Sequence, residues 1–194
     1  MMTAIEIART IEASGLRLLT LREFKRLLDI AEENTAYKTA ERLVKQGLLR
    51  RLKKGLYCFA FAKPSTLEIA NALYAPSYVS LESALNFYGI LSQFPYPITS
   101  VTPRKTERIE ADGKEFEYVH LAPKYFFGFT KIEAVLIAQP EKALVDELYL
   151  VSKGIREVVI EELDLSRLDK GRLQAYVQQI PYSPLQALWQ RIDL

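Results

Sequence analysis

The sequence predicts an α+β protein of two domains, residues 1–63 and residues 64–194. Three observations predict this class. Hydrophobic residues recur at helical spacing through most of the first domain and alternate, as in strands, in several later segments. Residues 1–63 carry 13 Lys and Arg against 7 Asp and Glu, whereas residues 64–194 carry 13 against 17. All nine prolines and 16 of the 21 aromatic residues follow residue 63, so we expect the boundary near Lys63–Ser65.

Composition excludes several classes of protein. With 194 residues, 49% of them hydrophobic and 26% charged, the chain is long and apolar enough to bury a core. No apolar run approaches the roughly 20 residues that span a bilayer, and the N-terminus lacks the pattern of a secretory signal. A single cysteine, Cys58, and a single histidine, His120, argue against a disulfide and a His-rich metal site. We expect a cytoplasmic protein without membrane association, metal or cofactor.

Three short helices are predicted before residue 48. The first covers TAIEIARTIEAS and ends at Gly15, which tolerates the left-handed backbone of a helix C-terminus. Thr20 and Glu23 have the spacing of a capping box and begin the second helix. Asn34 is the predicted N-cap of the third helix, which runs to about Gln46.

The third helix has one apolar side and one side that presents hydrogen-bond donors. At 100° per residue, the apolar side holds Ala36, Ala40, Leu43 and Val44. Next come two strand-like runs, Leu48–Leu52 and Leu56–Phe61, separated by Lys53-Lys54-Gly55, which predicts a hairpin with a basic tip. Three helices followed by such a hairpin predict a winged helix-turn-helix, whose third helix enters the DNA major groove.

The predicted DNA-binding residues combine the polar side of the third helix with the cations of the hairpin. They are Asn34, Thr35, Lys38, Arg42, Lys45, Arg50, Arg51, Lys53 and Lys54. A Lys/Arg stripe on a small helix is most often only a solvated face. DNA binding is favoured here because helix and hairpin cations follow one another closely and Glu41 is the only acid between positions 34 and 67.

The second domain is predicted to mix helices and strands. Helices are expected at Leu67–Tyr74, after Ser80 up to Gly89, from Pro140 to Gly154, at about Leu168–Ile180, and in a last amphipathic segment ending in LQALWQRIDL. Strands are expected at Pro97–Thr102, Glu107–Ala111, Lys114–Leu121 and residues 131–138 (KIEAVLIA). Asp112-Gly113 is a strong type I′ turn signal between two of these strands.

Several segments of the second domain resemble the AbiEi antitoxin family. They are PSYVSLESALNFYGIL, ITSVT, HLAP with KYFFGF, and QPEKALVDELYL. The resemblance spans most of residues 16–150, and the C-terminal residues beyond it match no segment of the family. It implies a transcriptional regulator with an N-terminal winged helix and a C-terminal antitoxin domain, from type IV toxin–antitoxin and abortive-infection phage-defence systems.

The resemblance also implies partners. We expect binding to double-stranded operator DNA at inverted repeats in the chain's own promoter, which favours a homodimer on DNA, and opposition to a nucleotidyltransferase-like toxin encoded beside it. Whether the toxin is covered directly or opposed indirectly stays open. Exposed candidates for toxin contact are Arg104, Lys105, Tyr125 and Phe127, although aromatic residues at this density more often form core.

The sequence also suggests two other functions. Acids and a lysine at residues 112–117, with His120, superficially suggest a metal-dependent nuclease. The turn explains Asp112-Gly113, however, and the alternation after it is typical of a half-buried strand with His120 on the face opposite Glu115 and Glu117, so we expect no catalytic residue and no enzyme. The second alternative is a ligand-responsive winged-helix repressor without a toxin partner, which the N-terminal pattern fits equally well.

Overall fold

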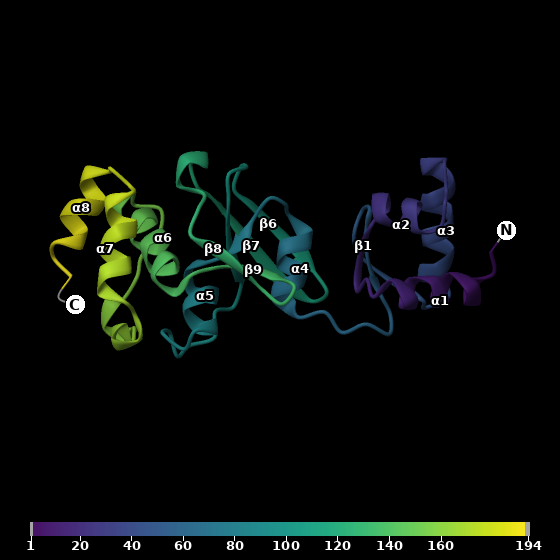
Figure 1. The fold of residues 1–194 in the computed structure, drawn as a ribbon, viewed down its shortest axis with the longest axis horizontal. Coiled ribbons are helices and arrows are strands. Elements are labelled where there is room, and N and C mark those ends of the chain that lie inside the picture. The colour runs from purple at the N-terminus through teal and green to yellow at the C-terminus, as the bar shows by residue number, and fades with distance from the viewer. Residues whose placement is uncertain (1, 193–194) are drawn as a thin grey trace. The chain divides into compact units, whose positions relative to one another are not determined.

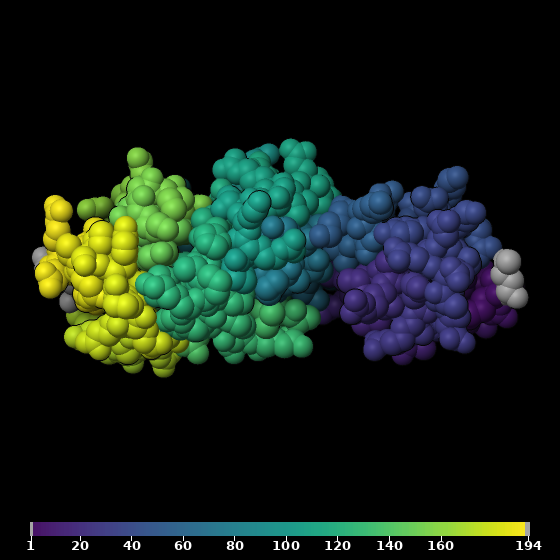
Figure 2. All heavy atoms as spheres, turned by 90° about the horizontal axis from the view of Figure 1, so that it is seen from above, coloured from purple at the N-terminus to yellow at the C-terminus, as the bar shows by residue number. Residues whose placement is uncertain are grey.

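The computed structural model describes residues 2–192, which form two compact units, one ending at Leu73 and the other beginning at Tyr74. Both units contain helices and sheet, which confirms the predicted α+β class (Figure 1). The boundary between the units lies after the helix Thr66–Leu73, whereas composition predicts a boundary before this helix, near Lys63–Ser65. Figure 2 shows the surface of the first unit from purple to blue and that of the second from teal to yellow.

The first unit has the element order of a winged helix. Its elements are α1 (Ala4–Ser14), β1 (Leu18–Thr20), α2 (Leu21–Leu27), α3 (Glu33–Lys45), β2 (Leu49–Lys53), β3 (Leu56–Phe59) and α4 (Thr66–Leu73). The three strands form an antiparallel sheet in the order β1-β3-β2. Strand β1 was not predicted, because three residues are too few to show an alternating pattern.

Local signals explain most of the helix ends in the first unit. Thr3 and Thr20 both form complete capping boxes, with Glu6 and Glu23 respectively. Gly15 ends α1 at φ 70°, as predicted. The predicted N-cap at Asn34 is wrong: α3 begins at Glu33, so Asn34 lies in its first turn. The Ala36 amide already donates to the Glu32 carbonyl at 3.1 Å, so the helix forms without a side-chain cap.

The core of the first unit is apolar and joins the helices to one face of the sheet. Ala36, Ala40 and Leu43 are buried, which confirms the predicted packing side of α3. They pack in one cluster with Ile11, Phe24, Leu19, Leu49, Tyr57 and Phe59. Cys58 is buried as well, where its side chain behaves as a small apolar group.

The second unit contains a six-stranded mixed sheet and four helices. Its elements are β4 (Tyr78–Val79), α5 (Leu81–Phe87), β5 (Ile98–Thr102), β6 (Glu107–Ala111), β7 (Lys114–His120), β8 (Phe129–Ile132), β9 (Val135–Ala138), α6 (Pro140–Ser152), α7 (Lys170–Gln178) and α8 (Ser183–Trp189), with short 3-10 turns at Pro123–Tyr125, Ile160–Glu162 and Leu165–Arg167. The strand order is β6-β7-β5-β4-β9-β8. The pairs β5–β7 and β4–β9 are parallel and the other pairs antiparallel.

Several predictions for the second unit are confirmed and three need correction. The turn at Asp112-Gly113 has φ values of 55° and 71°, as its type requires. Residues 131–138 are not one strand, because a turn with Glu133 at φ 52° separates β8 from β9. The predicted solvent-facing side of β7 is wrong, since this interior strand lies between β6 and β5 and Glu117 is buried. The last predicted helix ends at Trp189, and residues 193–194 of that prediction lie outside the described residues.

Helix α6 is the most deeply buried element of the second unit. All ten residues from Glu141 to Leu150 are buried, polar ones included. The helix packs against α5, β9, α7 and α8, and the C-terminal helices lie beside it in Figure 1. A helix covered on every side cannot be amphipathic, so its four charged residues at 141, 142, 146 and 147 need internal partners.

Candidate nucleic-acid interface

Helix α3 presents all five of its predicted DNA-binding side chains to solvent. Asn34, Thr35, Lys38, Arg42 and Lys45 are exposed, opposite the buried residues of the same helix. Two features border this stripe. On one edge, Thr35 and Arg42 line a pocket of about 320 Å³ that α1 closes from the other side. On the other edge lies the hairpin between β2 and β3.

The hairpin tip is held against the first turns of α2 and α3. The Gly55 carbonyl accepts a hydrogen bond of 2.8 Å from the amide of Leu21. Gly55 has φ +77°, and a Cβ built there would lie 3.5 Å from the Tyr37 hydroxyl. The Lys54 ammonium lies 5.9 Å from the centre of the Tyr37 ring. Lys54 therefore borders the polar stripe of α3, and Tyr37 connects the two.

The register of the hairpin divides its four cations between the two faces of the sheet. Arg51 lies opposite Tyr57, which belongs to the core beneath α3, whereas Arg50 lies opposite Cys58 on the other face. A register shift follows Arg51, and the Lys53 ammonium donates to the carbonyl of Leu73. Arg51 and Lys54 thus lie on the α3 side, and Arg50 and Lys53 lie away from it.

Electrostatics agree with this assignment of Arg51. Burial is the main cause that raises the pKa of Tyr57, and the positive charge of Arg51 partly offsets it. The same phenol also feels Tyr37 and Glu41 of α3. The Arg51 guanidinium therefore lies close to the helix as well as to the strand.

Sequence reasoning missed a second group of cations, on α2. Arg22, Lys25 and Arg26 line a groove of about 560 Å³ that Tyr37 closes from the α3 side. Asp29 and Glu33 also line it, so its charge is mixed. The signal was available: Leu21 and Phe24 point inward, so the basic residues between and after them had to face solvent. In helix-turn-helix proteins the first helix of the motif crosses the phosphate backbone.

These features form one chemically coherent surface. Guanidinium and ammonium groups from α2, α3 and the hairpin tip offer contacts to phosphates, and the first turns of a 13-residue helix carry an amide and a hydroxyl at Asn34 and Thr35. Phosphate contacts supply affinity, and donors on the helix that enters the groove supply sequence preference.

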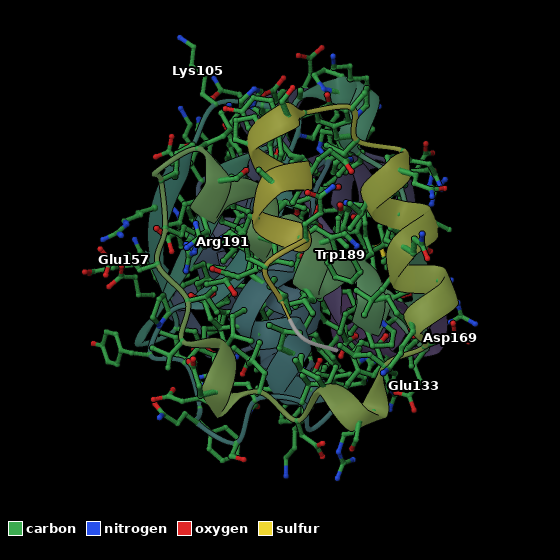
Figure 3. The ribbon with its side chains drawn as sticks, turned by 90° about the vertical axis from the view of Figure 1, so that its left-hand side faces the viewer. Lys105, Glu133, Glu157, Asp169, Trp189 and Arg191 are labelled. Carbon is green, nitrogen blue, oxygen red and sulfur yellow. The ribbon has the colours of Figure 1, made fainter. Side chains whose placement is uncertain are left out.

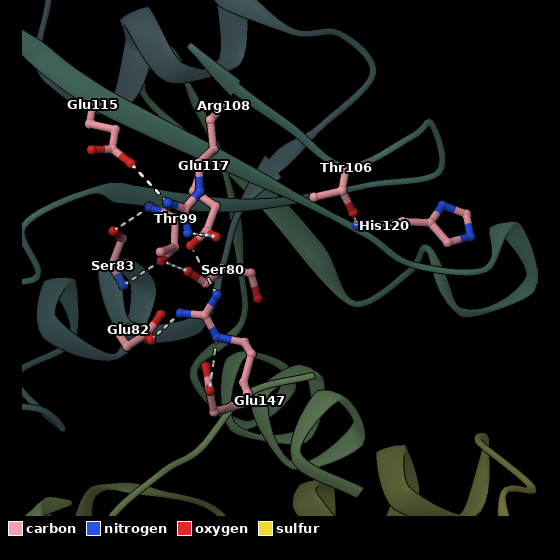
Figure 4. A network of polar contacts seen from close by, with 11 residues as sticks. Ser80, Glu82, Ser83, Thr99, Thr106, Arg108, Glu115, Glu117, His120 and Glu147 are labelled. Atoms are coloured by element: carbon pink, nitrogen blue, oxygen red, sulfur yellow. Dashed lines mark hydrogen bonds and ion pairs between the residues drawn. The ribbon is translucent and has the colours of Figure 1, made fainter. Parts of the chain in front are cut away.

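The polar network of the second unit has a different character. Glu82, Glu117 and Glu147 converge on the guanidinium of Arg156 (Figure 4), and Glu117 also pairs with Arg108 at 2.9 Å. Burial, with the charge of Glu82 added, raises the pKa of Glu147 to about 8, although Arg156 opposes the shift. Within residues 2–192 no group of three or more His, Cys, Asp or Glu is arranged to hold a metal ion. Of the carboxylates that suggested a nuclease, Glu117 is thus engaged by Arg156 and Arg108, and Glu115 lies 3.5 Å from Arg108.

A second buried pair lies within α6 itself. The Lys142 ammonium donates to Asp146, and both side chains are fully buried. The hydroxyls of Tyr78 and Ser80 donate to the other Asp146 oxygen, at 2.9 and 2.8 Å. Burial raises the pKa of Asp146 despite these partners. Every member of this network has a partner within it, which indicates a structural role.

His120 and the candidate toxin contacts of the second unit lie outside these two networks. His120 makes its hydrogen bonds outside the Arg156 network. Its backbone amide donates to the Thr106 hydroxyl at 3.1 Å, and its ring nitrogen Nδ1 lies 2.7 Å from the Arg104 carbonyl oxygen. The histidine is thus hydrogen-bonded within the fold. Of the candidate toxin contacts, Arg104 and Lys105 are exposed, but Tyr125 is buried, so it is not available to a partner.

Comparison with known families supports the N-terminal assignment. Residues 6–60 match the family model described as transcriptional regulator, AbiEi antitoxin. Over the winged helix, this match agrees with the predicted family, whereas most segments that carried the sequence resemblance lie in the second unit, outside the match. No curated protein matches the chain. No helix within the described range 2–192 has the length and hydropathy needed to cross a membrane.

Proposed function

We propose that this chain, whose residues 6–60 match the AbiEi antitoxin regulators, is the DNA-binding antitoxin of a type IV toxin–antitoxin system that represses its own operon. The observation that carries the proposal is the exposed polar stripe of α3, flanked by Lys54 and Arg51 of the hairpin, within the segment that matches the family. No step of this function requires bond-making chemistry, so we propose action by binding alone.

Base contacts and phosphate contacts are assigned to different elements of the proposed interface. We propose that α3 enters the major groove with Asn34, Thr35 and Lys38 toward base edges, and that Arg42 and Lys45 reach the groove walls. Lys54 and Arg51, together with Arg22 and Lys25 of α2, would bind phosphates on either side. Inverted repeats in the operator would seat two copies of the chain.

The second unit would oppose the toxin, a nucleotidyltransferase-like protein. What supports this part is the antitoxin description of the matched family and the presence of a separate folded unit after the winged helix. The residues of the proposed DNA interface all belong to the first unit, so we assign the second unit to the other partner.

The first test measures salt-dependent affinity for a duplex from the chain's own promoter. Arg51→Ala/Lys54→Ala is compared with Arg50→Ala/Lys53→Ala, a matched pair of equal charge from the same hairpin. We expect the first pair to reduce the log–log salt slope by about 2, near 0.9 for each lost phosphate contact, and the second to change it little. Equal slopes for both pairs and the unaltered chain would refute the assigned face.

The second test separates repression from toxin opposition. The full chain with Lys38→Ala, Arg42→Ala and Lys45→Ala is co-expressed with the neighbouring gene product, placed under an independent promoter. We expect operator binding to be lost while growth rescue persists. A neighbouring gene that encodes no nucleotidyltransferase, or rescue by neither form, would instead favour the ligand-responsive repressor without a toxin partner.

A further inference from the structure

The second unit carries a pocket with an aromatic rim that its fold does not use. The pocket has a volume of about 370 Å³ and lies between the loop 93–97, residues 157–163 and helix α5. Phe94 and Tyr96 are 88% and 87% exposed, and Val159 is 54% exposed. Two aromatic rings that are almost entirely exposed to water contribute almost no burial energy to the stability of the fold. Exposed apolar side chains gathered around one hollow mark an interaction site.

The charges of this pocket all have one sign. Glu82, Glu157 and Glu162 line it, and the described lining residues include no Lys, Arg or His. The Oε2 atom of Glu82 is buried and has no hydrogen-bond partner within residues 2–192. Glu157 extends outward from the unit in Figure 3, and the exposed Glu162 accepts a 3.2 Å hydrogen bond from the side-chain amide of Gln93. Arg156 pairs with Glu82 through Oε1, as well as with Glu117 and Glu147, so the uncompensated negative charge of the pocket comes from Glu157 and Glu162.

The negative charge continues beyond the pocket on the other side of Tyr96. Tyr96 also lines a second hollow with three acids, Glu110, Asp112 and Glu115, and one cation, Lys114. These two glutamates lie directly opposite each other on β6 and β7, an arrangement that weakens a sheet. Arg108 approaches Glu115 only at 3.5 Å while it holds Glu117 at 2.9 Å. Tyr96 therefore stands between two acidic hollows.

We propose that this acidic–aromatic pocket is the docking site for an arginine or lysine side chain on an extended basic segment of a partner protein. Aromatic rings beside carboxylates are suited to a cation, which stacks on the ring faces while the carboxylates take its donors. A pocket of about 370 Å³ accommodates a side chain and its neighbours rather than a whole helix. The proposal goes beyond operator binding and does not depend on it.

The test uses the full chain and a hexa-arginine peptide, titrated by calorimetry near physiological salt. The probe variants are Phe94→Ala/Tyr96→Ala, for the aromatic rim, and Glu157→Gln/Glu162→Gln, for the charge. The matched controls are Phe61→Ala, an aromatic that is 71% exposed in the first unit, and Glu107→Gln/Glu133→Gln, two exposed acids of the second unit outside the pocket. All substituted side chains lie at the surface, so thermal unfolding should be unchanged and loss of binding will not reflect loss of fold.

We expect each probe variant to raise the Kd of the hexa-arginine peptide at least tenfold and each control variant to raise it less than twofold. A hexa-glutamate peptide should not bind. Equal weakening by probe and control variants would mean attraction to overall charge and would overturn the proposal. Free arginine binding as tightly as the peptide would overturn the basic segment in favour of a small cationic ligand. Self-association of the chain that the probe variants abolish would overturn it in favour of a second copy.

Discussion

The two units place their charged residues in opposite ways. In the first unit, Lys38, Arg42 and Lys45 stand in solvent around a core built from aliphatic and aromatic side chains. In the second, five charged side chains are buried, against one in the first unit within residues 2–192. Exposed charges cost little to keep and remain available to a partner, whereas buried charges need partners inside the fold.

The two units should therefore respond differently to substitution of their charged residues. Substitutions of surface cations in the first unit should change binding and leave the fold intact. Substitutions of the charges around α6 should change the fold, because every removed partner leaves a buried charge or hydroxyl unpaired.

The largest effect is expected for Asp146→Ala. It leaves the fully buried Lys142 without its counter-charge, and the hydroxyls of Tyr78 and Ser80 lose their acceptor. We expect the free energy of unfolding of the second unit to fall by about 3–5 kcal/mol. Urea unfolding followed by the fluorescence of Trp189, the chain's one tryptophan, reports this unit. The control is Lys142→Met/Asp146→Leu, which should recover most of the loss; no difference between the two variants would contradict the prediction.

The second effect is a pH dependence from Glu147. Its pKa is about 8 in the folded chain against an ordinary value of 4.5 for a glutamate, so between these values the folded state holds a proton that the unfolded state has lost. Stability conferred by this proton is complete below about pH 4.5 and declines as pH rises toward 8, by up to about 1.4 kcal/mol per pH unit. Glu147→Gln cannot titrate and should flatten the decline between pH 5 and 8. Parallel stability–pH curves for both forms would refute the assignment.

The third effect compares two glycines of similar backbone. Gly15 and Gly128 have φ values of 70° and 74°, but a Cβ at Gly15 meets nothing within 4 Å, whereas one at Gly128 would lie 2.8 Å from Lys142 Cγ. Gly15→Ala should cost about 1 kcal/mol through backbone strain alone. Gly128→Ala should cost about 1–2 kcal/mol more, because it also disturbs the buried lysine. Differential scanning calorimetry of both variants measures the difference, and equal losses would speak against tight packing around Lys142.

The smallest effect is expected on the stability of the first unit. Lys38→Ala/Arg42→Ala removes exposed side chains of α3, so the free energy of unfolding should change by less than about 0.5 kcal/mol. The same variant should lose about 1–3 kcal/mol of preference for the operator if either side chain contacts a base. Circular dichroism melts and competition with unrelated duplexes measure the two quantities. A large loss of stability would show that the contrast between the units does not hold.

Much of the fold could be predicted because its signals are local. Capping at Thr20, the glycine ends of helices and the Asp112-Gly113 turn each depend on a few neighbouring residues. The exposed side of α3 followed from helical spacing alone. Strands β1 and β4 could not be predicted, because three and two residues carry no period and form strands only where a distant partner pairs with them.

Local sequence patterns were enough to predict the approximate extents of the helices, the Asp112-Gly113 turn, and a basic first domain with one polar helix side. Only the tertiary structure decided that Arg51 faces α3 while Arg50 faces away, that Glu117 is buried, and that Phe94 and Tyr96 border an acidic pocket. These features differ in how far apart in the sequence the residues that decide them lie. Helix and turn preferences act over a few residues, whereas the face of a strand, the burial of a charge and the lining of a pocket depend on segments far away in the chain.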